Sequence, residues 1–139
     1  CPYCNTHLRE LKDVSKDLDA LGYKTVALSP DTPAELRKTL AKHDLPYALL
    51  SDSKMDAARA MGLVFRVDDK TIKKYEQYGI DLERSSGEKH HWLPVPGLFL
   101  IDPDGKVAFV YANPDYKVRL KGAVLLSAAK AALEPAQKP

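Results

Sequence analysis

The sequence has few cysteines and no long apolar run. It contains two cysteines among 139 residues, too few for the disulfide framework of a small secreted scaffold. No apolar run approaches the roughly 20 residues that cross a bilayer, and the first residues do not form a signal peptide. We therefore expect a soluble chain without a membrane-spanning segment.

The sequence also has no marked excess of basic or acidic residues. The chain carries 21 Lys and Arg against 19 Asp and Glu, a formal net charge of +2, and its basic residues are scattered. Partners such as nucleic acid or a membrane surface are therefore not expected. The length and the 45% hydrophobic content are typical of one compact domain with its own core, so residues 1–139 are predicted to form a single domain.

The first residue is Cys1 rather than a methionine, so a leader or an upstream structural segment could precede the given chain. The compartment is therefore left open, with a cytoplasmic location favoured.

The first half of the sequence alternates helical and strand patterns. Apolar residues recur at three- and four-residue steps over Asn5–Leu21, which predicts an amphipathic helix. A second helix is expected from Thr32, whose side chain can cap it, to about His43. The remaining elements expected here are strands at Lys24–Leu28 and Tyr47–Leu50 and a short helix from Asp52 or Ser53 to Met61.

A polar stretch follows. Residues 66–95 are predicted to be a surface insertion, which contains a charged helical segment at Asp68–Tyr78.

The last part of the sequence predicts a hairpin and a helix. Gly97–Ile101 and Lys106–Tyr111 flank the turn Asp102–Gly105, which is typical of a β-hairpin. An Ala-rich helix is expected over Arg119–Leu133, followed by a tail at 134–139.

The two cysteines form the motif Cys1-Pro2-Tyr3-Cys4 at the start of the first predicted helix. A thiolate is the species that attacks disulfides and peroxides. Free N–H groups at a helix N-terminus stabilise the thiolate, so cysteines in such motifs have pKa values of roughly 3.5–7.5 instead of about 8.5.

Pro2 suits the first helical position because it has no N–H. The spacing lets Cys4 reach Cys1 and close a small disulfide ring, so either can attack and the other resolve. Together with the helix and strand alternation, the motif predicts an α/β thioredoxin-like fold.

Two alternatives stay open for these cysteines. They could be ordinary structural cysteines without redox chemistry. They could also bind zinc together with His90 and His91, which would complete four nominal ligands. Adjacent histidines rarely point at one metal and a second cysteine pair is missing, so we predict no metal and no cofactor.

A proline ahead of the hairpin is a candidate for shaping the site. Thioredoxin-like folds place a cis-proline facing the cysteines just before a core strand, and Val95-Pro96 precedes Gly97. A cis bond occurs in only about 5–6% of X-Pro bonds. We predict a cis Val95–Pro96 bond, the alternative being a trans-proline that ends a loop.

Other residues could tune or border the site. His7 lies three residues after Cys4 on the same helical face and could adjust a thiolate or carry a proton, unless it is a solvated helix histidine. Tyr3 is predicted to be a contact residue beside the sulfurs. Trp92 and Tyr116 are predicted to be packing groups or the rim of a substrate site. The remaining histidines are predicted to lie on the surface: His43, His90 and His91.

Four segments in order resemble the alkyl hydroperoxide reductase and thiol-specific antioxidant (AhpC/TSA) family: Cys1–Leu11, Val26–Asp31, Leu49–Asp52 and Pro96–Gly105. The resemblance spans nearly the whole chain. It implies a peroxiredoxin-like protein with a thioredoxin-like fold, a central mixed β-sheet flanked by helices, and a peroxiredoxin-type insertion. It also implies that Cys4 holds the position of the peroxide-attacking cysteine.

The sequence departs from this family pattern at three points. Cys1 stands where the family has a Thr or Ser hydroxyl, and Pro96 stands where an arginine that stabilises the bound peroxide is expected. The family also has a strand before the cysteine helix, so an upstream strand could be missing. Without the hydroxyl and the arginine, the motif resembles the equipment of thiol–disulfide exchange.

These features predict a thiol-based oxidoreductase that cycles Cys1 and Cys4 between dithiol and disulfide. In a peroxidase Cys4 attacks the peroxide and Cys1 resolves; in a disulfide reductase the exposed Cys1 attacks a partner disulfide. A third interpretation is a non-enzymatic module whose disulfide switches the Arg66–Trp92 loop. The expected partners are a peroxide or disulfide substrate and a thiol reductant such as a thioredoxin or glutaredoxin system, and the oligomeric state is left open.

Overall fold

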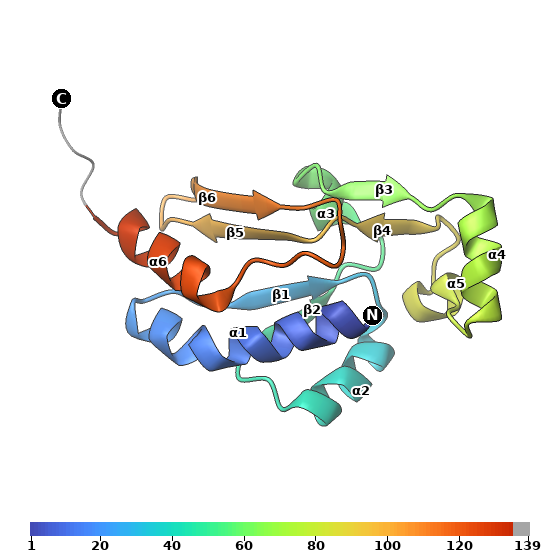
Figure 1. The fold of residues 1–139 in the computed structure, drawn as a ribbon, viewed down its shortest axis with the longest axis horizontal. Coiled ribbons are helices and arrows are strands. Elements are labelled where there is room, and N and C mark those ends of the chain that lie inside the picture. Colours follow the sequence, from blue (N-terminus) through green and yellow to red (C-terminus); the bar gives the residue numbers. More distant parts are fainter. Residues whose placement is uncertain (135–139) are drawn as a thin grey trace. The chain divides into compact units, whose positions relative to one another are not determined.

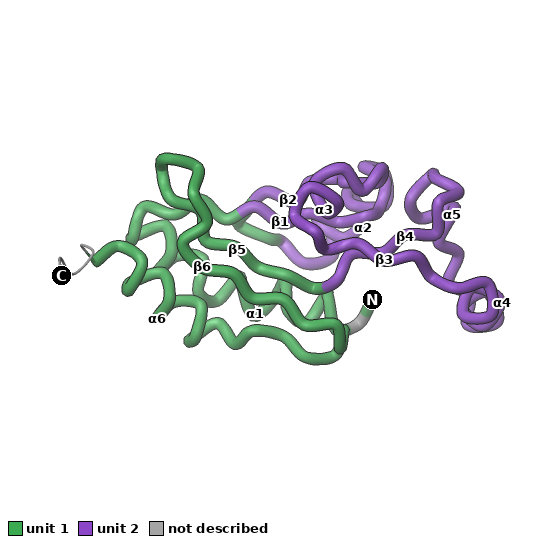
Figure 2. The backbone as a smooth tube through the Cα atoms, turned by 90° about the horizontal axis from the view of Figure 1, so that it is seen from above, with its two compact units in different colours: residues 1–25, 45–47, 96–139 green, residues 26–44, 48–95 purple. Residues whose placement is uncertain are grey.

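The computed structural model describes residues 1–134, apart from the Pro2 side chain, so most of the predicted tail at 134–139 lies outside the described residues. Its contacts divide the chain into two compact units (Figure 2). Unit 1 comprises residues 1–25, 45–47 and 96 onward, and unit 2 comprises residues 26–44 and 48–95. That residues 1–139 form a single domain stays a prediction.

Unit 1 contains two helices and a hairpin, which Figure 1 shows as α1, α6 and the β5–β6 pair. Its elements confirm the predicted first helix, hairpin and last helix: α1 (Pro2–Ala20), β5 (Gly97–Ile101), β6 (Val107–Ala112) and α6 (Gly122–Ala132). The hairpin closes where the Asp102 side chain accepts a hydrogen bond from the backbone N–H of Lys106, at 2.8 Å. β5 and β6 pair antiparallel, with an irregularity in register between Leu100 and Ile101.

The core of unit 1 lies between one face of this hairpin and the two helices. Leu18 of α1, Leu100 of β5 and Leu125 of α6 are buried in one cluster. Tyr23, just after α1, donates a hydrogen bond from its hydroxyl to the carbonyl of Ala129 at 3.1 Å. Each fully buried apolar side chain stabilises the fold by about 1.5–3 kcal/mol, so this cluster determines where α1 and its N-terminus lie.

Unit 2 contains a parallel strand pair with a helix between its strands in sequence. β1 (Val26–Ser29) pairs in parallel with β2 (Ala48–Ser51), and α2 (Pro33–His43) lies between them in the chain. The predicted cap is present, because the Thr32 hydroxyl accepts a hydrogen bond from the N–H of Glu35 at 3.4 Å.

The rest of unit 2 contains elements that the sequence predicted only in part. The elements are α3 (Asp56–Ala60), β3 (Val64–Arg66), α4 (Asp69–Gln77), α5 (Leu82–Ser86) and β4 (Trp92–Pro94). α3 and α4 confirm predicted helices, whereas α5 and β4 were not predicted. β4 pairs antiparallel with β3, so its strand character comes from a partner that is distant in sequence.

The strands of the described residues pair in three two-stranded ladders. β1·β2 is parallel, and β3·β4 and β5·β6 are antiparallel. This mixture agrees with the predicted α/β class, but the ladders are separate, whereas the family resemblance implied one central mixed sheet. Each ladder lies inside one unit. Which strands pair depends on contacts between segments that are distant in sequence, so no single segment predicts the pairing.

None of the helices within residues 1–134 has both the length and the apolar character that crossing a membrane requires. The longest, α1, has 19 residues and alternates apolar with charged positions.

Candidate active site

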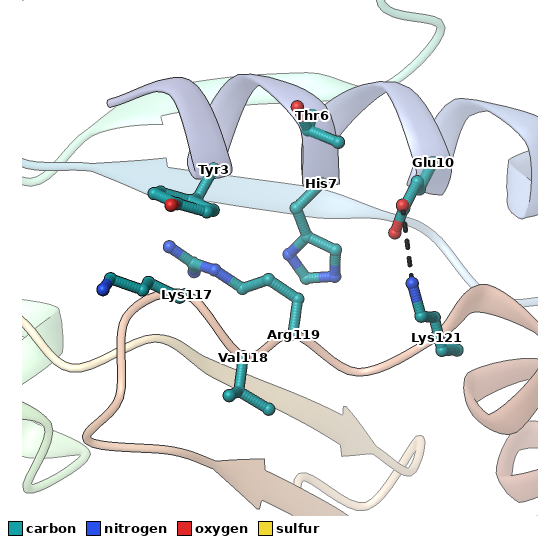
Figure 3. A pocket seen from close by; sticks show the side chains of 8 residues that line it. All are labelled: Tyr3, Thr6, His7, Glu10, Lys117, Val118, Arg119 and Lys121. Atoms are coloured by element: carbon teal, nitrogen blue, oxygen red, sulfur yellow. Dashed lines mark ion pairs between the residues drawn. The ribbon is translucent and has the colours of Figure 1, made fainter.

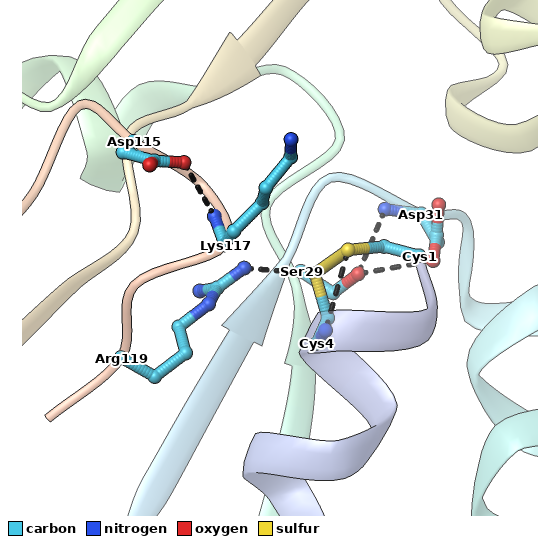
Figure 4. The surroundings of a disulfide bond; sticks show 7 residues. All are labelled: Cys1, Cys4, Ser29, Asp31, Asp115, Lys117 and Arg119. Carbon is cyan, nitrogen blue, oxygen red and sulfur yellow. Dashed lines mark hydrogen bonds between the residues drawn. A yellow bond between two sulfur atoms is a disulfide. The ribbon is translucent and has the colours of Figure 1, made fainter. Parts of the chain in front are cut away.

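Cys1 and Cys4 are joined by a disulfide at the start of α1 (Figure 4). Their Cα atoms are 5.3 Å apart. Cys1 is the N-cap of the helix, and its Sγ accepts a hydrogen bond from the backbone N–H of Cys4 at 3.2 Å. Cys1 is exposed and Cys4 is half-buried. Pro2 is the first helical residue, as predicted, while its side chain lies outside the described residues.

An arginine lies beside the inner cysteine. Arg119 donates from Nη2 to the Sγ of Cys4 at 3.4 Å. It belongs to the segment between β6 and α6, next to the buried core residue Leu120. Burial lowers the pKa of Arg119, and the nearby Tyr111 acts in the opposite direction. The guanidinium still carries its charge at neutral pH, so it would stabilise a thiolate on Cys4 once the disulfide is reduced.

Arg119 was not among the residues predicted for the site. The sequence comparison placed the expected arginine at the position of Pro96 and took it as lost. Position 96 is a proline, as that interpretation states, and the structure adds an arginine that reaches Cys4 from a different segment. No spacing rule could reveal this contact, because the two residues are 115 positions apart.

His7 faces Arg119 in the same region (Figure 3). It is half-buried rather than fully solvated, and its Nε2 is buried without a hydrogen-bond partner in the described structure. Burial is the main cause that lowers the pKa of His7, and the positive charge of Arg119 adds to it. A hydrogen bond with the Leu120 backbone and the charge of Glu10 raise the pKa in part. His7 is therefore a neutral imidazole at neutral pH.

A cavity of about 420 Å³ lies between the face of α1 that carries His7 and the segment before α6. Figure 3 shows side chains from both segments pointing into it. The lining residues are Tyr3, Thr6, His7, Glu10, Lys117, Val118, Arg119 and Lys121.

Two tyrosines border the site. Tyr3 and Tyr116 make an edge-to-face contact with ring centroids 5.6 Å apart. Both are exposed, at 42% and 51%. Tyr3 directly precedes Cys4 in the chain, and the roles of Tyr3 as a contact residue and Tyr116 as a rim or packing group stay predictions.

Most of the chain matches a known protein family. The AhpC/TSA family pattern matches residues 1–110. The chain belongs to the AhpC/TSA family. Over 62 residues this AhpC/TSA chain is 36% identical to a Haemophilus influenzae protein whose name describes it as a peroxiredoxin of the bcp type. That match covers 45% of the present chain and 40% of the relative, so it spans less than half of either protein.

Solved structures share the fold of this AhpC/TSA chain. Peroxidoxin BcpB from Mycobacterium tuberculosis superimposes with a TM-score of 0.69 at 19% identity, covering 97% of this chain and 73% of that one. The bacterioferritin comigratory protein of Xanthomonas campestris has a TM-score of 0.73 at 20% identity, with 96% and 72% covered. A Cys-to-Ser mutant of peroxiredoxin 6 from Arenicola marina has 0.73 at 19%, with 99% and 62% covered. These likenesses show the predicted thioredoxin-like fold.

The Val95–Pro96 peptide bond of this AhpC/TSA chain does not have the predicted cis conformation. No peptide bond among the described residues is cis, so Val95–Pro96 is trans and the cis prediction is wrong. The N–H of Val95 donates to the carbonyl of Leu63 at 2.8 Å, and the carbonyl of Pro96 accepts from the N–H of Asn113 at 3.1 Å. Both residues extend strand ladders, and a trans bond, which X-Pro sequences favour, lets the chain stay extended between them.

The other predicted residues lie in unit 2 and make contacts of their own. His90 stacks on Trp92 with ring centroids 5.1 Å apart, and its Nε2 lies 2.8 Å from the carbonyl of Ser53. His91 Nε2 is 2.8 Å from a carboxylate oxygen of Glu83. His90, His91 and His43 are half-buried, so each keeps part of its surface exposed. In the described part of the chain, no cluster of three or more His, Cys, Asp or Glu residues could hold a metal.

Proposed function

We propose that this chain is a thiol peroxidase in which Cys4 attacks a peroxide and Cys1 resolves the product. The observation that carries the proposal is the contact between Arg119 Nη2 and Cys4 Sγ at 3.4 Å. A peroxidase needs a thiolate with a cation beside it, both to keep the sulfur ionised and to stabilise charge as the O–O bond breaks. Arg119 supplies that cation to Cys4.

The proposed cycle has two oxidation steps. The Cys4 thiolate attacks one peroxide oxygen, the O–O bond breaks, and the other oxygen leaves and takes up a proton as an alcohol or water. Cys4 is then a sulfenic acid. The Cys1 thiol attacks the Cys4 sulfur, the S–O bond breaks, and water leaves as the disulfide forms. No cofactor is needed for either step.

Reduction closes the cycle. Two thiol groups of a reductant return the disulfide to the dithiol and are themselves oxidised to a disulfide. A thioredoxin or glutaredoxin system is the proposed donor. The family supports a peroxide as the oxidant, and the Xanthomonas campestris protein was solved in work on its alkyl peroxide reduction activity.

A second candidate function is protein disulfide reduction. The observation that favours it is the exposure of Cys1 at the N-cap, where its sulfur accepts a hydrogen bond from the N–H of Cys4. In that function Cys1 attacks a partner disulfide, and Cys4 displaces the reduced partner from the mixed disulfide.

The two functions separate in one experiment on the fully reduced protein. Thiol loss after mixing with hydrogen peroxide is followed in the wild type, Cys1→Ser and Cys4→Ser. A peroxidatic Cys4 predicts rapid oxidation in the wild type and Cys1→Ser, a sulfenic acid trapped by dimedone on Cys4 in Cys1→Ser, and slow oxidation in Cys4→Ser. If the wild type reacts no faster than a free thiol, the peroxidase proposal fails and disulfide exchange becomes the better account.

A further inference from the structure

Two exposed tyrosines of unit 1 have their rings in contact. Tyr3 lies in the first turn of α1, and Tyr116 lies in the segment between β6 and α6. Their ring centroids are 5.6 Å apart and their planes meet at 81°. Both side chains are exposed, at 42% and 51%, so rotation about their side-chain bonds can bring the carbons beside the two hydroxyl groups together.

Other tyrosines of the described chain lack one of these two features. Tyr23 and Tyr47 are half-buried, and each donates its hydroxyl to a backbone carbonyl, of Ala129 and Leu8 respectively. Removing the hydroxyl hydrogen from such a phenol also breaks a hydrogen bond, which opposes the loss. Tyr78 is 69% exposed, but its ring takes part in none of the aromatic contacts of the described residues.

We propose that Tyr3 and Tyr116 form a site of oxidative modification, at which alkoxyl radicals join the two rings as a dityrosine. Organic hydroperoxides release such radicals when they take up one electron. Each phenol gives a hydrogen atom to one alkoxyl radical, which becomes an alcohol. The two phenoxyl radicals then couple through one ring carbon each, next to the oxygen, and the hydrogen on each coupled carbon moves to the phenoxyl oxygen. The reaction uses two radicals and neither cysteine, so it stands apart from the peroxidase proposal.

The cross-link would connect the two segments that flank Cys4. Tyr3 directly precedes Cys4, and the Arg119 that follows Tyr116 in the same segment donates to the Cys4 sulfur. The new bond also closes a loop of nearly the whole described chain, which removes conformational freedom from the unfolded state. The cross-linked protein is therefore expected to unfold at a higher urea concentration than the untreated protein.

The test exposes the full chain to a water-soluble azo initiator that releases alkoxyl and peroxyl radicals. The disulfide form is used, so that no thiol consumes the radicals. Monomers are separated from cross-linked dimers in denaturant, and dityrosine is measured by its fluorescence. We expect dityrosine in the monomer at a yield per chain that dilution leaves unchanged, because both rings belong to one molecule. Peptide mapping should find the Tyr3 and Tyr116 peptides joined, with the loss of two hydrogen atoms.

Three conservative variants locate the cross-link. Tyr3→Phe and Tyr116→Phe should each lower the monomer yield about five-fold or more, because phenylalanine forms no phenoxyl radical and the remaining tyrosine loses its neighbour. Tyr78→Phe is the matched control at an exposed tyrosine, and it should lower only the yield of dimers. The proposal is overturned if wild-type dityrosine is absent or occurs only in dimers. It is also overturned if both Tyr3→Phe and Tyr116→Phe keep the wild-type monomer yield.

Discussion

Arg119 donates to the sulfur of Cys4 at 3.4 Å although the two residues are 115 positions apart. The contact depends on the core, because the neighbouring Leu120 is buried with the residues that pack α1 against α6. Burial of that one leucine holds the backbone of Arg119 next to α1. The chemistry of the cysteine pair and the packing of unit 1 are therefore coupled.

Replacing the arginine is expected to slow oxidation of the inner cysteine. Arg119→Met keeps most of the side-chain volume and removes the charge-assisted hydrogen bond, which is worth about 1.5–3 kcal/mol. The rate constant of the reduced protein with hydrogen peroxide at neutral pH is expected to fall about ten-fold or more. The matched control is Arg9→Met on the same helix, where the arginine is exposed and bonds only Thr6 in the described structure. Equal rates in the two variants would contradict a role for Arg119.

The pKa of His7 is expected to be below 6.5 and to depend on Arg119. Burial is the larger cause and the guanidinium the second, so Arg119→Met should raise this pKa without restoring it fully. Titration of the His7 ring by NMR in both proteins measures the change. A His7 pKa that is identical in the two proteins would show that the guanidinium does not act on this imidazole.

The same shift predicts how acid affects stability. The folded state holds His7 neutral, so the unfolded chain binds the proton more readily. This contribution to stability is present above pH 6.5 and is lost as the pH falls through the lower pKa of the folded state. Urea unfolding of the wild type and His7→Gln at pH 7.5 and 5 is the measurement. The loss of stability between these values is expected to be smaller in the variant.

Tyr47 is expected to contribute to stability through its hydroxyl. The group donates to the carbonyl of Leu8 in α1 at 2.5 Å, and burial raises the pKa of Tyr47 to about 12. Tyr47→Phe should lower the free energy of unfolding by about 1 kcal/mol. Tyr78→Phe, at a residue that is 69% exposed, should change it by less than about 0.5 kcal/mol.

Alkaline titration gives a second readout for Tyr47. Folding raises its pKa above the usual value of 10.0, so the stabilisation is present below that value and is lost as the pH rises toward about 12. The absorbance of tyrosinate in Tyr47→Phe should lack the group that titrates at about pH 12 in the wild type. If the variant still shows this absorbance change, the group belongs to another tyrosine.

Replacing Gly122, the first residue of α6, by alanine is expected to destabilise the protein. A Cβ at this position would lie 2.9 Å from a side-chain carbon of Val14 in α1. Gly122→Ala should therefore destabilise unit 1 by about 1–3 kcal/mol, although alanine favours helices. Val14→Ala removes the clash, so the double variant should be more stable than the sum of the two single changes predicts. Additive effects in chemical unfolding would exclude this contact as the cause.

The sequence predicted the elements whose signals are local. The apolar stripe of α1, the Thr32 cap of α2 and the turn between β5 and β6 each depend on residues a few positions apart. The Cys1 and Cys4 pair at a helix start belongs to the same class, because its spacing and its cap are contained in four consecutive residues. Family membership followed from short motifs in a fixed order.

Features that depend on distant partners were missed or mispredicted. β4 acquires its strand structure from β3, and the polar sequence around it shows no alternation. The Val95–Pro96 bond is trans, and the residues on its two sides hydrogen-bond to Leu63 and Asn113, which are distant in sequence.

The amino-acid sequence by itself determined the spacing of Cys1 and Cys4, the helix that presents them and the family, because periodicity, capping and motif spacing act over a few residues. Only the tertiary structure decided which cation stands beside the sulfur and which side chains enclose the neighbouring cavity. Those contacts join α1 to the segment before α6, and burial of Leu18, Leu120 and Leu125 in one core brings the two segments together. Such burial depends on the whole folded unit, so no local pattern encodes it.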